Sequence, residues 1–167
     1  MLDQSTIDRL RAAPVAAAGH LIDGKSDTDG AGEPIEVISP IDGSLLTTLA
    51  DGDDAIVARA VTAARQAFED GRWSKMAPAA RKAVMHRWAE LVQANAAELA
   101  VLGVRDNGTE IGMAFRAEPG SAAATLRYYA EVCDKIYGEI APTPGDILGM
   151  IHKEPVGVVG AIIPWNF

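Results

Sequence analysis

The middle of the chain carries apolar residues at steps of three and four, the spacing that places them on one face of a helix. In the stretch between residues 53 and 71, the apolar positions are Val57, Val61, Ala64 and Phe68. Asp53 and Asp54 stand where an N-cap and a first-turn acid belong, and Gly71 ends the run. The pattern predicts one amphipathic helix.

Further helices are indicated by the residues at their ends. Pro78 opens one of them, because proline suits the first helical turn. Its apolar face consists of Val84, Trp88, Leu91 and Val92. Another runs from Glu98 to Asp106 and stops at Asn107-Gly108, which accepts the left-handed conformation. We expect Pro119 to open a last helix and Gly138 to cap it.

Outside the helices, short β-prone pieces alternate with turn residues. Between His20 and Ala50 these pieces are HLIDG, IEVIS and LLTTLA, with a polar loop over residues 25–32. They predict an antiparallel hairpin or meander. Residues 4–18 suit a short helix interrupted by Pro14. Because that Ala-rich run has little to bury, we expect a loosely held tail.

The end of the chain indicates the fold class. Residues 156–163 form a continuous apolar run bounded by Pro155 and Pro164, which is typical of a strand covered on both faces of a parallel sheet. Parallel strands are joined by crossovers of about a dozen residues or more, and only residues 164–167 follow the run. We therefore expect an α/β fold that is incomplete, the N-terminal piece of a longer protein.

Composition narrows the class of protein. The chain has 167 residues, of which 49% are hydrophobic and 23% charged, and its formal charge is −8. This is the composition of a soluble globular protein, and the acidic balance disfavours nucleic acid as a partner. The longest apolar stretch, 156–165, falls short of the roughly 20 residues that span a bilayer, so no membrane association is expected. The acidic N-terminus does not resemble a signal peptide, and cytoplasmic localisation is predicted.

Chemistry is suggested by Pro164-Trp165-Asn166-Phe167, which comes immediately after the predicted buried strand. Open α/β sheets bind their ligands at the carboxyl ends of their strands. The Asn166 side-chain amide could there stabilise an oxyanion that develops on an attacked carbonyl. The alternative is a turn in which Trp165 packs and Asn166 tolerates an unusual backbone angle. The four residues alone favour the turn.

The wider context changes this balance. The string EPVGVVGAIIPWNF, residues 154–167, resembles the hallmark segment of the aldehyde dehydrogenase superfamily. Other landmarks agree in order and spacing: IDG at 22–24, SPIDG at 39–43, DGDDAIVARAVTAARQAF at 51–68, RKAV at 81–84, RDNG at 105–108 and LRYYAEVCDKIYGEI at 126–140. The resemblance covers roughly residues 20–167. Within the superfamily, the chain looks most like enzymes that oxidise γ-glutamyl-γ-aminobutyraldehyde and related aminoaldehydes.

The resemblance implies a mechanism and a set of site residues. In the family a cysteine thiolate attacks the aldehyde to form a thiohemiacetal, hydride passes to NAD or NADP, and a glutamate helps water to cleave the thioester. Asn166 matches the asparagine that holds the oxyanion. The positions that match the cofactor lining are Ile162, Ile163, Pro164 and Trp165. Phe167 matches an aromatic residue at the mouth of the substrate tunnel.

Two further assignments follow from the resemblance. Asp106 matches an acid that in some members joins a monovalent cation site with the backbone near Ile38, although a hydrated surface role is the alternative. The family often continues with Lys-Pro where this chain has Thr109-Glu110, which leaves the cation site open. Ser121 replaces a larger apolar residue of many relatives, and we expect a roomier, more polar tunnel entrance suited to an aminoaldehyde.

The family's nucleophile and general base lie downstream of the PWNF motif in this comparison. Cys133 is the only cysteine and lies on a helical stripe with Leu126, Ala130 and Tyr137, so we expect an inert core thiol. The three histidines are scattered and predict no metal site. Gly157 and Gly160 lie inside the predicted strand and do not make a dinucleotide fingerprint.

The leading interpretation is the N-terminal part of an NAD(P)-dependent aldehyde dehydrogenase that is homo-oligomeric when complete and inactive as this chain alone. An alternative is a short interaction protein that pairs with full-length subunits and modulates them. A small NAD-binding module is disfavoured, because one parallel strand forms no binding crevice. The expected division is a flexible tail (1–19), a hairpin and helical part (20–137), an oligomerisation arm (138–154) and the first strand of the nucleotide-binding sheet with its motif (155–167).

Overall fold

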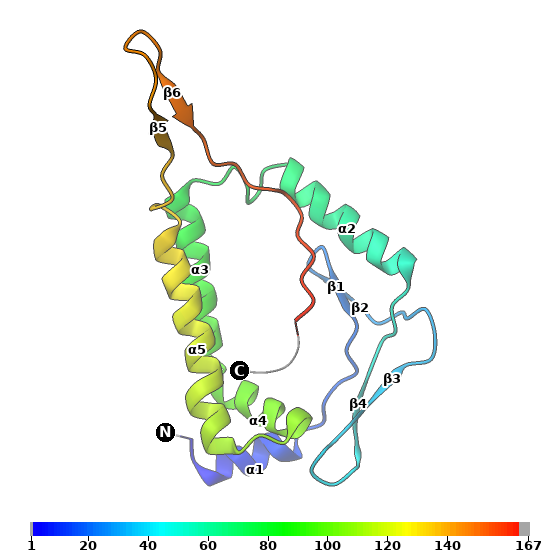
Figure 1. The fold of residues 1–167 in the computed structure, drawn as a ribbon. Coiled ribbons are helices and arrows are strands. Elements are labelled where there is room, and N and C mark those ends of the chain that lie inside the picture. Colours follow the sequence, from blue (N-terminus) through cyan, green and yellow to red (C-terminus); the bar gives the residue numbers. More distant parts are fainter. Residues whose placement is uncertain (1, 164–167) are drawn as a thin grey trace.

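The computed structural model describes residues 2–163, which fold into helices and short antiparallel hairpins (Figure 1). The helices are α1 (Gln4–Ala12), α2 (Asp54–Glu69), α3 (Pro78–Ala94), α4 (Ala96–Asn107) and α5 (Ile111–Val132). The strands are β1 (His20–Ile22), β2 (Lys25–Asp27), β3 (Ile35–Ile38), β4 (Leu45–Leu49), β5 (Glu139–Ala141) and β6 (Gly149–Ile151). None of the described helices is long and apolar enough to cross a membrane.

Helices α2, α3 and α4 confirm the elements expected from periodicity and end signals. Asp53 caps α2, because its side chain accepts a hydrogen bond from the backbone N–H of Ile56 at 2.9 Å. Pro78 is the first residue of α3. Gly108 ends α4 in the left-handed conformation, with φ of 79°. Local sequence therefore determines where these helices begin and end.

Helix α5 differs from the expectation at both ends. It begins at Ile111, because the Glu110 carboxylate accepts hydrogen bonds from the backbone N–H groups of Gly112 and Met113, each at 2.7 Å. Pro119 therefore lies inside the helix and does not open it. An interior proline costs about 3 kcal/mol, and Pro119 is buried within this helix. The prediction that Gly138 caps this helix is also wrong, since α5 ends at Val132.

The N-terminal segment is attached to the body rather than left loose. The Arg105 guanidinium donates a hydrogen bond to the backbone carbonyl of Ala13 at 2.7 Å, just beyond the end of α1. Ala18 then donates to the carbonyl of Thr48 at 3.0 Å and forms a parallel bridge with β4. A loose tail was expected because this segment has little apolar surface to bury. It is held instead through its own backbone N–H and C=O groups.

The strands between β1 and β4 form two separate hairpins, β1–β2 and β3–β4, rather than one meander. Residues 25–27, expected in a polar loop, pair with β1 as β2. The turn between them is Asp23-Gly24, with φ of 49° and 73°, the positive values that a two-residue hairpin favours. Arg59 of α2 forms an ion pair with Asp27 at 2.5 Å, which attaches this hairpin to the helix.

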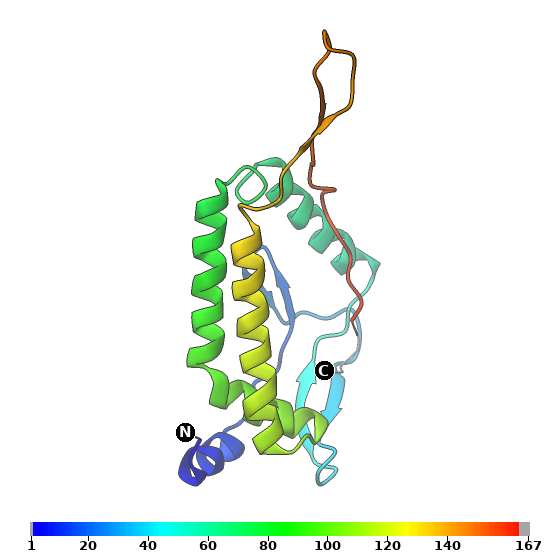
Figure 2. The ribbon, with the colours of Figure 1, turned by 60° about the vertical axis from the view of Figure 1, so that its left-hand side comes forward.

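The β5–β6 hairpin projects from the end of the helical body, and the chain then returns past α2 (Figures 1 and 2). Residues 152–163 belong to no strand, so the expectation of a strand over 156–163 is wrong for the described part of the chain. The side chains of Val156 and Val159 are 89% and 70% exposed. A parallel strand is stabilised only by neighbouring strands, and residues 2–163 provide none beside this segment.

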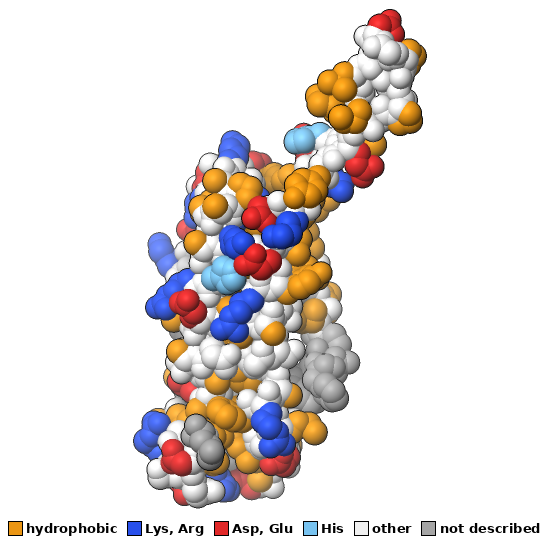
Figure 3. Space-filling view, turned by 90° about the vertical axis from the view of Figure 1, so that its left-hand side faces the viewer, with side chains coloured by type: hydrophobic (Ala, Val, Ile, Leu, Met, Phe, Trp, Pro, Cys, Tyr) orange, Lys and Arg blue, Asp and Glu red, His pale blue; other side chains and the backbone are white. Residues whose placement is uncertain are grey.

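The interior is made of small side chains. Its fully buried members are Ala89, Ala100, Ala114, Ala123 and Ala130, all on α3, α4 and α5. Alanine lets the helix axes approach closely, and α5 packs along both α3 and α4. Larger apolar side chains lie on the surface, including the predicted apolar faces of α2 and α3. Figure 3 shows hydrophobic side chains on the projecting hairpin and along one side of the body.

We predict that Ala123→Leu destabilises the chain by about 1–3 kcal/mol, because the added methylene groups must fit between closely packed helices. Ala124→Leu is the matched control, since Ala124 is exposed on the same helix. Urea unfolding followed by circular dichroism measures both. Equal effects of the two substitutions would contradict the close packing at Ala123.

Candidate functional site

The residues expected to carry chemistry lie at the end of the segment that returns past α2. Pro164, Trp165, Asn166 and Phe167 lie outside the described residues. Ile162 and Ile163 are described, and their side chains are 104% and 83% exposed. Both isoleucines therefore present open apolar surface next to the motif in sequence. Residues that line one side of an incomplete cleft would do the same.

The remaining expected site residues lie on other elements. Ser121 is exposed in the middle of α5. Asp106 is exposed near the end of α4 and lines a hollow of about 390 Å³ together with Val37 of β3. Ile38 follows Val37 at a register irregularity of the β3–β4 hairpin. The fold thus brings Asp106 close to β3, while its role as a cation ligand stays a prediction.

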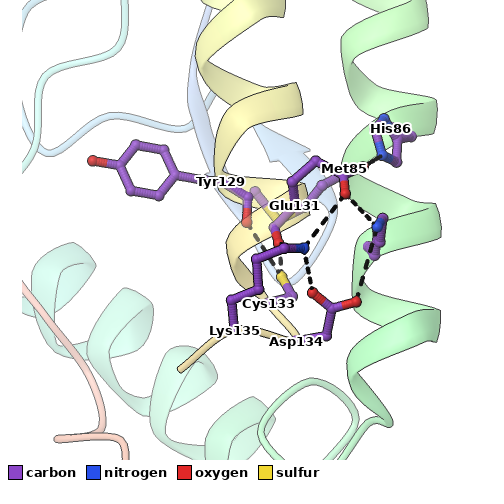
Figure 4. Close-up of polar contacts among 8 residues, drawn as sticks. Met85, His86, Tyr129, Glu131, Cys133, Asp134 and Lys135 are labelled. Carbon is purple, nitrogen blue, oxygen red and sulfur yellow. Dashed lines mark hydrogen bonds and ion pairs between the residues drawn. The ribbon is translucent and has the colours of Figure 1, made fainter. Parts of the chain in front are cut away.

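Cys133 lies at the end of α5, with its thiol turned toward α3 (Figure 4). Its Sγ atom lies 3.8 Å from Sδ of Met85 and 3.4 Å from the backbone carbonyl oxygen of Tyr129. The residue is half-buried. Cys133 also lines a cavity of about 700 Å³ that contains His152 and Glu154, so the expectation of an inert core thiol stays a prediction.

A charged cluster around Glu131 was not predicted from the sequence (Figure 4). The Glu131 carboxylate binds Lys82 and, at 2.9 Å, Nε2 of His86, both on α3. Lys135 lies 3.7 Å from Glu131 and 2.8 Å from Asp134. Hydrogen bonds from Lys82 and His86 hold the pKa of Glu131 below its ordinary value. The cluster joins α3 to α5 at their solvent-exposed side.

A cavity of about 700 Å³ lies at the base of the β5–β6 hairpin. Phe68 and Trp73 form its aromatic wall, while Arg81 and Lys153 are its basic residues. The segment that leads toward the PWNF motif closes one side of it. No group of three or more His, Cys, Asp or Glu side chains that could hold a metal ion occurs within residues 2–163.

Of the residues expected to line a dinucleotide cofactor, the structure describes Ile162 and Ile163. The exposed apolar side chains of Ile162 and Ile163 suit the flat face of a nicotinamide ring. The described part of the chain, however, presents no parallel sheet whose strand ends could hold a pyrophosphate. The role of Ile162 and Ile163 as cofactor lining therefore stays a prediction.

Comparison with known proteins gives concordant results in sequence and structure. The sequence model of the aldehyde dehydrogenase family matches residues 27–167. The NADP/NAD-dependent aldehyde dehydrogenase PuuC of Escherichia coli is 43% identical over 146 residues, which cover 87% of this chain and 30% of that protein. The chain thus spans 30% of the length of that relative and between 16% and 30% of the other curated relatives compared with it.

Solved structures agree. One of them is a variant of the indole-3-acetaldehyde dehydrogenase AldA of P. syringae in complex with NAD⁺. It superimposes with a TM-score of 0.87 at 39% identity, and the match covers 94% of this chain and 32% of the AldA chain. The γ-glutamyl-γ-aminobutyraldehyde dehydrogenase of Burkholderia cenocepacia gives a TM-score of 0.83 at 36% identity and covers 89% of this chain and 30% of its own. The chain matches about a third of each of these structures, which confirms the prediction of an incomplete N-terminal part of an aldehyde dehydrogenase fold, although the described sheets are short antiparallel hairpins.

We predict that Glu131→Gln lowers the urea midpoint of unfolding at neutral pH and that its effect becomes smaller as the pH falls below the ordinary glutamate range. The pKa of Glu131 is depressed in the folded state, so its contribution is present above the ordinary glutamate pKa. That contribution is lost as the pH falls through the depressed value. Glu90→Gln is the control, because among the described residues Glu90 forms its ion pair with Arg87 on its own helix. A Glu131→Gln effect that persists unchanged at pH 3 would refute the assignment.

Proposed function

The chain belongs to the aldehyde dehydrogenase family, and we propose that it forms the N-terminal part of an enzyme that oxidises an aldehyde to the carboxylic acid with NAD or NADP. The observation that carries this proposal is the family match over residues 27–167. We further propose an aminoaldehyde as substrate. The similarity to PuuC and to a γ-glutamyl-γ-aminobutyraldehyde dehydrogenase supports this substrate class.

Within this function, Asn166 donates its side-chain N–H to the oxygen of the attacked aldehyde. That oxygen gains negative charge in the transition state, so a donor fixed in place lowers the barrier. Phe167 borders the substrate tunnel, and Pro164 and Trp165 continue the wall begun by Ile162 and Ile163. These residues would line the site of NAD or NADP, which would supply the hydride acceptor when bound. The nucleophilic cysteine and the general base come from the rest of the enzyme.

The projecting hairpin supports a role in assembly. Ile140 and Met150 are 76% and 74% exposed on β5 and β6, and each of these strands has one unpaired edge within the described residues. Exposed apolar strands of this kind pair with another chain or aggregate. We propose that residues 138–154 contact a second subunit of a homo-oligomer. The same surface would serve the alternative function, a short chain that modulates full-length subunits.

We predict that Asn166→Ala in the full-length enzyme lowers kcat about a hundredfold to a thousandfold with little change in the aldehyde KM, because the lost donor acts in the transition state. Asn166→Asp should not restore activity, since a carboxylate repels the oxyanion. Steady-state NADH formation measures both variants. Retention of wild-type kcat by Asn166→Ala would contradict the role of this residue.

The 167-residue chain alone should give no NADH formation with any aldehyde, because the nucleophilic cysteine and the general base come from the rest of the enzyme. Turnover above background would overturn that expectation. The same chain, added to the full-length enzyme, tests the alternative function. A change in the activity or the elution volume of the enzyme would favour the modulating role.

We predict that Ser121→Met in the full-length enzyme raises the KM for an aminoaldehyde more than for a straight-chain aldehyde, because the larger apolar side chain narrows a polar entrance. Ser121→Ala is the matched control and removes only the hydroxyl group. The kcat/KM values for γ-aminobutyraldehyde and hexanal measure the effect. Equal changes with both substrates would count against a specificity role for Ser121.

A further inference from the structure

A cavity of about 310 Å³ lies between α1, α4 and the turn of the β3–β4 hairpin. Both ribbon views show α1 lying against α4 at one end of the helical body (Figures 1 and 2). The volume is at the lower end of the range of about 300–1,000 Å³ that is typical of small-molecule sites. The described lining includes no residue that the proposed function uses.

Most of the cavity wall is aliphatic. Val101 and Val104 are three residues apart, so they share one face of α4. Ile7 lines the cavity from α1, Ile41 from the turn of the β3–β4 hairpin and Ile111 from the first turn of α5. Branched aliphatic side chains from four elements thus surround one space, which suits the hydrocarbon part of a ligand.

Two arginines are the charged residues of the described lining, Arg11 on α1 and Arg105 on α4. Arg105 donates from Nη1 to the backbone carbonyl of Ala13 at 2.7 Å, and its guanidinium carries further N–H donors on Nε and Nη2. Arg11 is exposed and has no ion-pair partner within residues 2–163. The same cavity therefore joins an apolar wall to two cations.

We propose that this cavity binds a medium-chain carboxylate, which has a hydrocarbon chain of about six to ten carbons and a single carboxyl group. The hydrocarbon chain lies against the isoleucines and valines, and the carboxylate accepts hydrogen bonds from the guanidinium groups of Arg11 and Arg105. The whole chain carries a formal charge of −8, so an anion is repelled by the molecule at large and is attracted only where cations gather. This inference does not depend on the proposed function.

The test is isothermal titration calorimetry of the full-length protein with octanoate as the probe. Octanoate is expected to bind with a Kd of about 1 mM or below. Hexanoate should bind about tenfold more weakly, because two fewer methylene groups are buried. Octan-1-ol should also bind about tenfold more weakly, because it lacks the charge. Absence of octanoate binding, or equal affinities for octanoate and octan-1-ol, would overturn the proposal.

A variant of α1 locates the carboxylate. Arg11→Gln is expected to raise the octanoate Kd about threefold to tenfold, because it removes one of the two cations. Arg9→Gln is the matched control. Arg9 is exposed on the same helix and does not line the cavity, and its substitution changes the net charge equally. Octanoate bound elsewhere, the substrate cleft included, would keep its Kd in Arg11→Gln, and that result would overturn the proposal.

A variant outside α1 tests the aliphatic wall, so the proposal stays falsifiable if Arg11→Gln loosens α1. Ile41→Asp places a carboxylate beside the ligand and is expected to raise the octanoate Kd at least about tenfold. Leu45→Asp is the matched control, because Leu45 belongs to the same hairpin and does not line the cavity, and both side chains are 55% exposed. The unfolding temperature reports whether each variant is folded. Equal losses in the two folded variants would overturn the proposal, because the added charge alone would then explain them.

Discussion

The described residues cannot bury all of their apolar surface, and this structure depends on that constraint. The helices form and dock, but their closest contacts are made by alanines, and the periodic apolar faces of α2 and α3 stay open. Val57 on α2 and Trp88 on α3 are 59% and 58% exposed. Apolar faces of this extent are normally covered by further protein. Residues 156–163 need such cover most, because both sides of that run are apolar.

This constraint explains which parts of the fold were predictable from sequence. Asp53, Pro78 and Gly108 act on neighbouring backbone groups, so the ends of α2, α3 and α4 follow from local chemistry. The same reasoning predicts a helix start at Pro119, but the Glu110 cap starts α5 at Ile111 and Pro119 lies inside the helix. The strand expected over 156–163 needs partners distant in sequence, and the described residues provide none.

Some of the functional residues were predictable from sequence and others were not. The PWNF motif and its neighbours could be identified because they form one contiguous string, and the family match over residues 27–167 agrees with that string. The cluster around Glu131 could not be predicted, because Lys82 and His86 reach it from a different helix.

Hydrogen exchange tests the central claim most directly, that residues 156–163 become a covered strand when the rest of the enzyme is present. The backbone amides of this segment are compared in the 167-residue chain and in the full-length enzyme. The account predicts rapid exchange in the short chain and strong protection in the full-length enzyme, with the α3–α5 interface protected in both. Rapid exchange of these amides in the full-length enzyme, or equal protection in both, would contradict it.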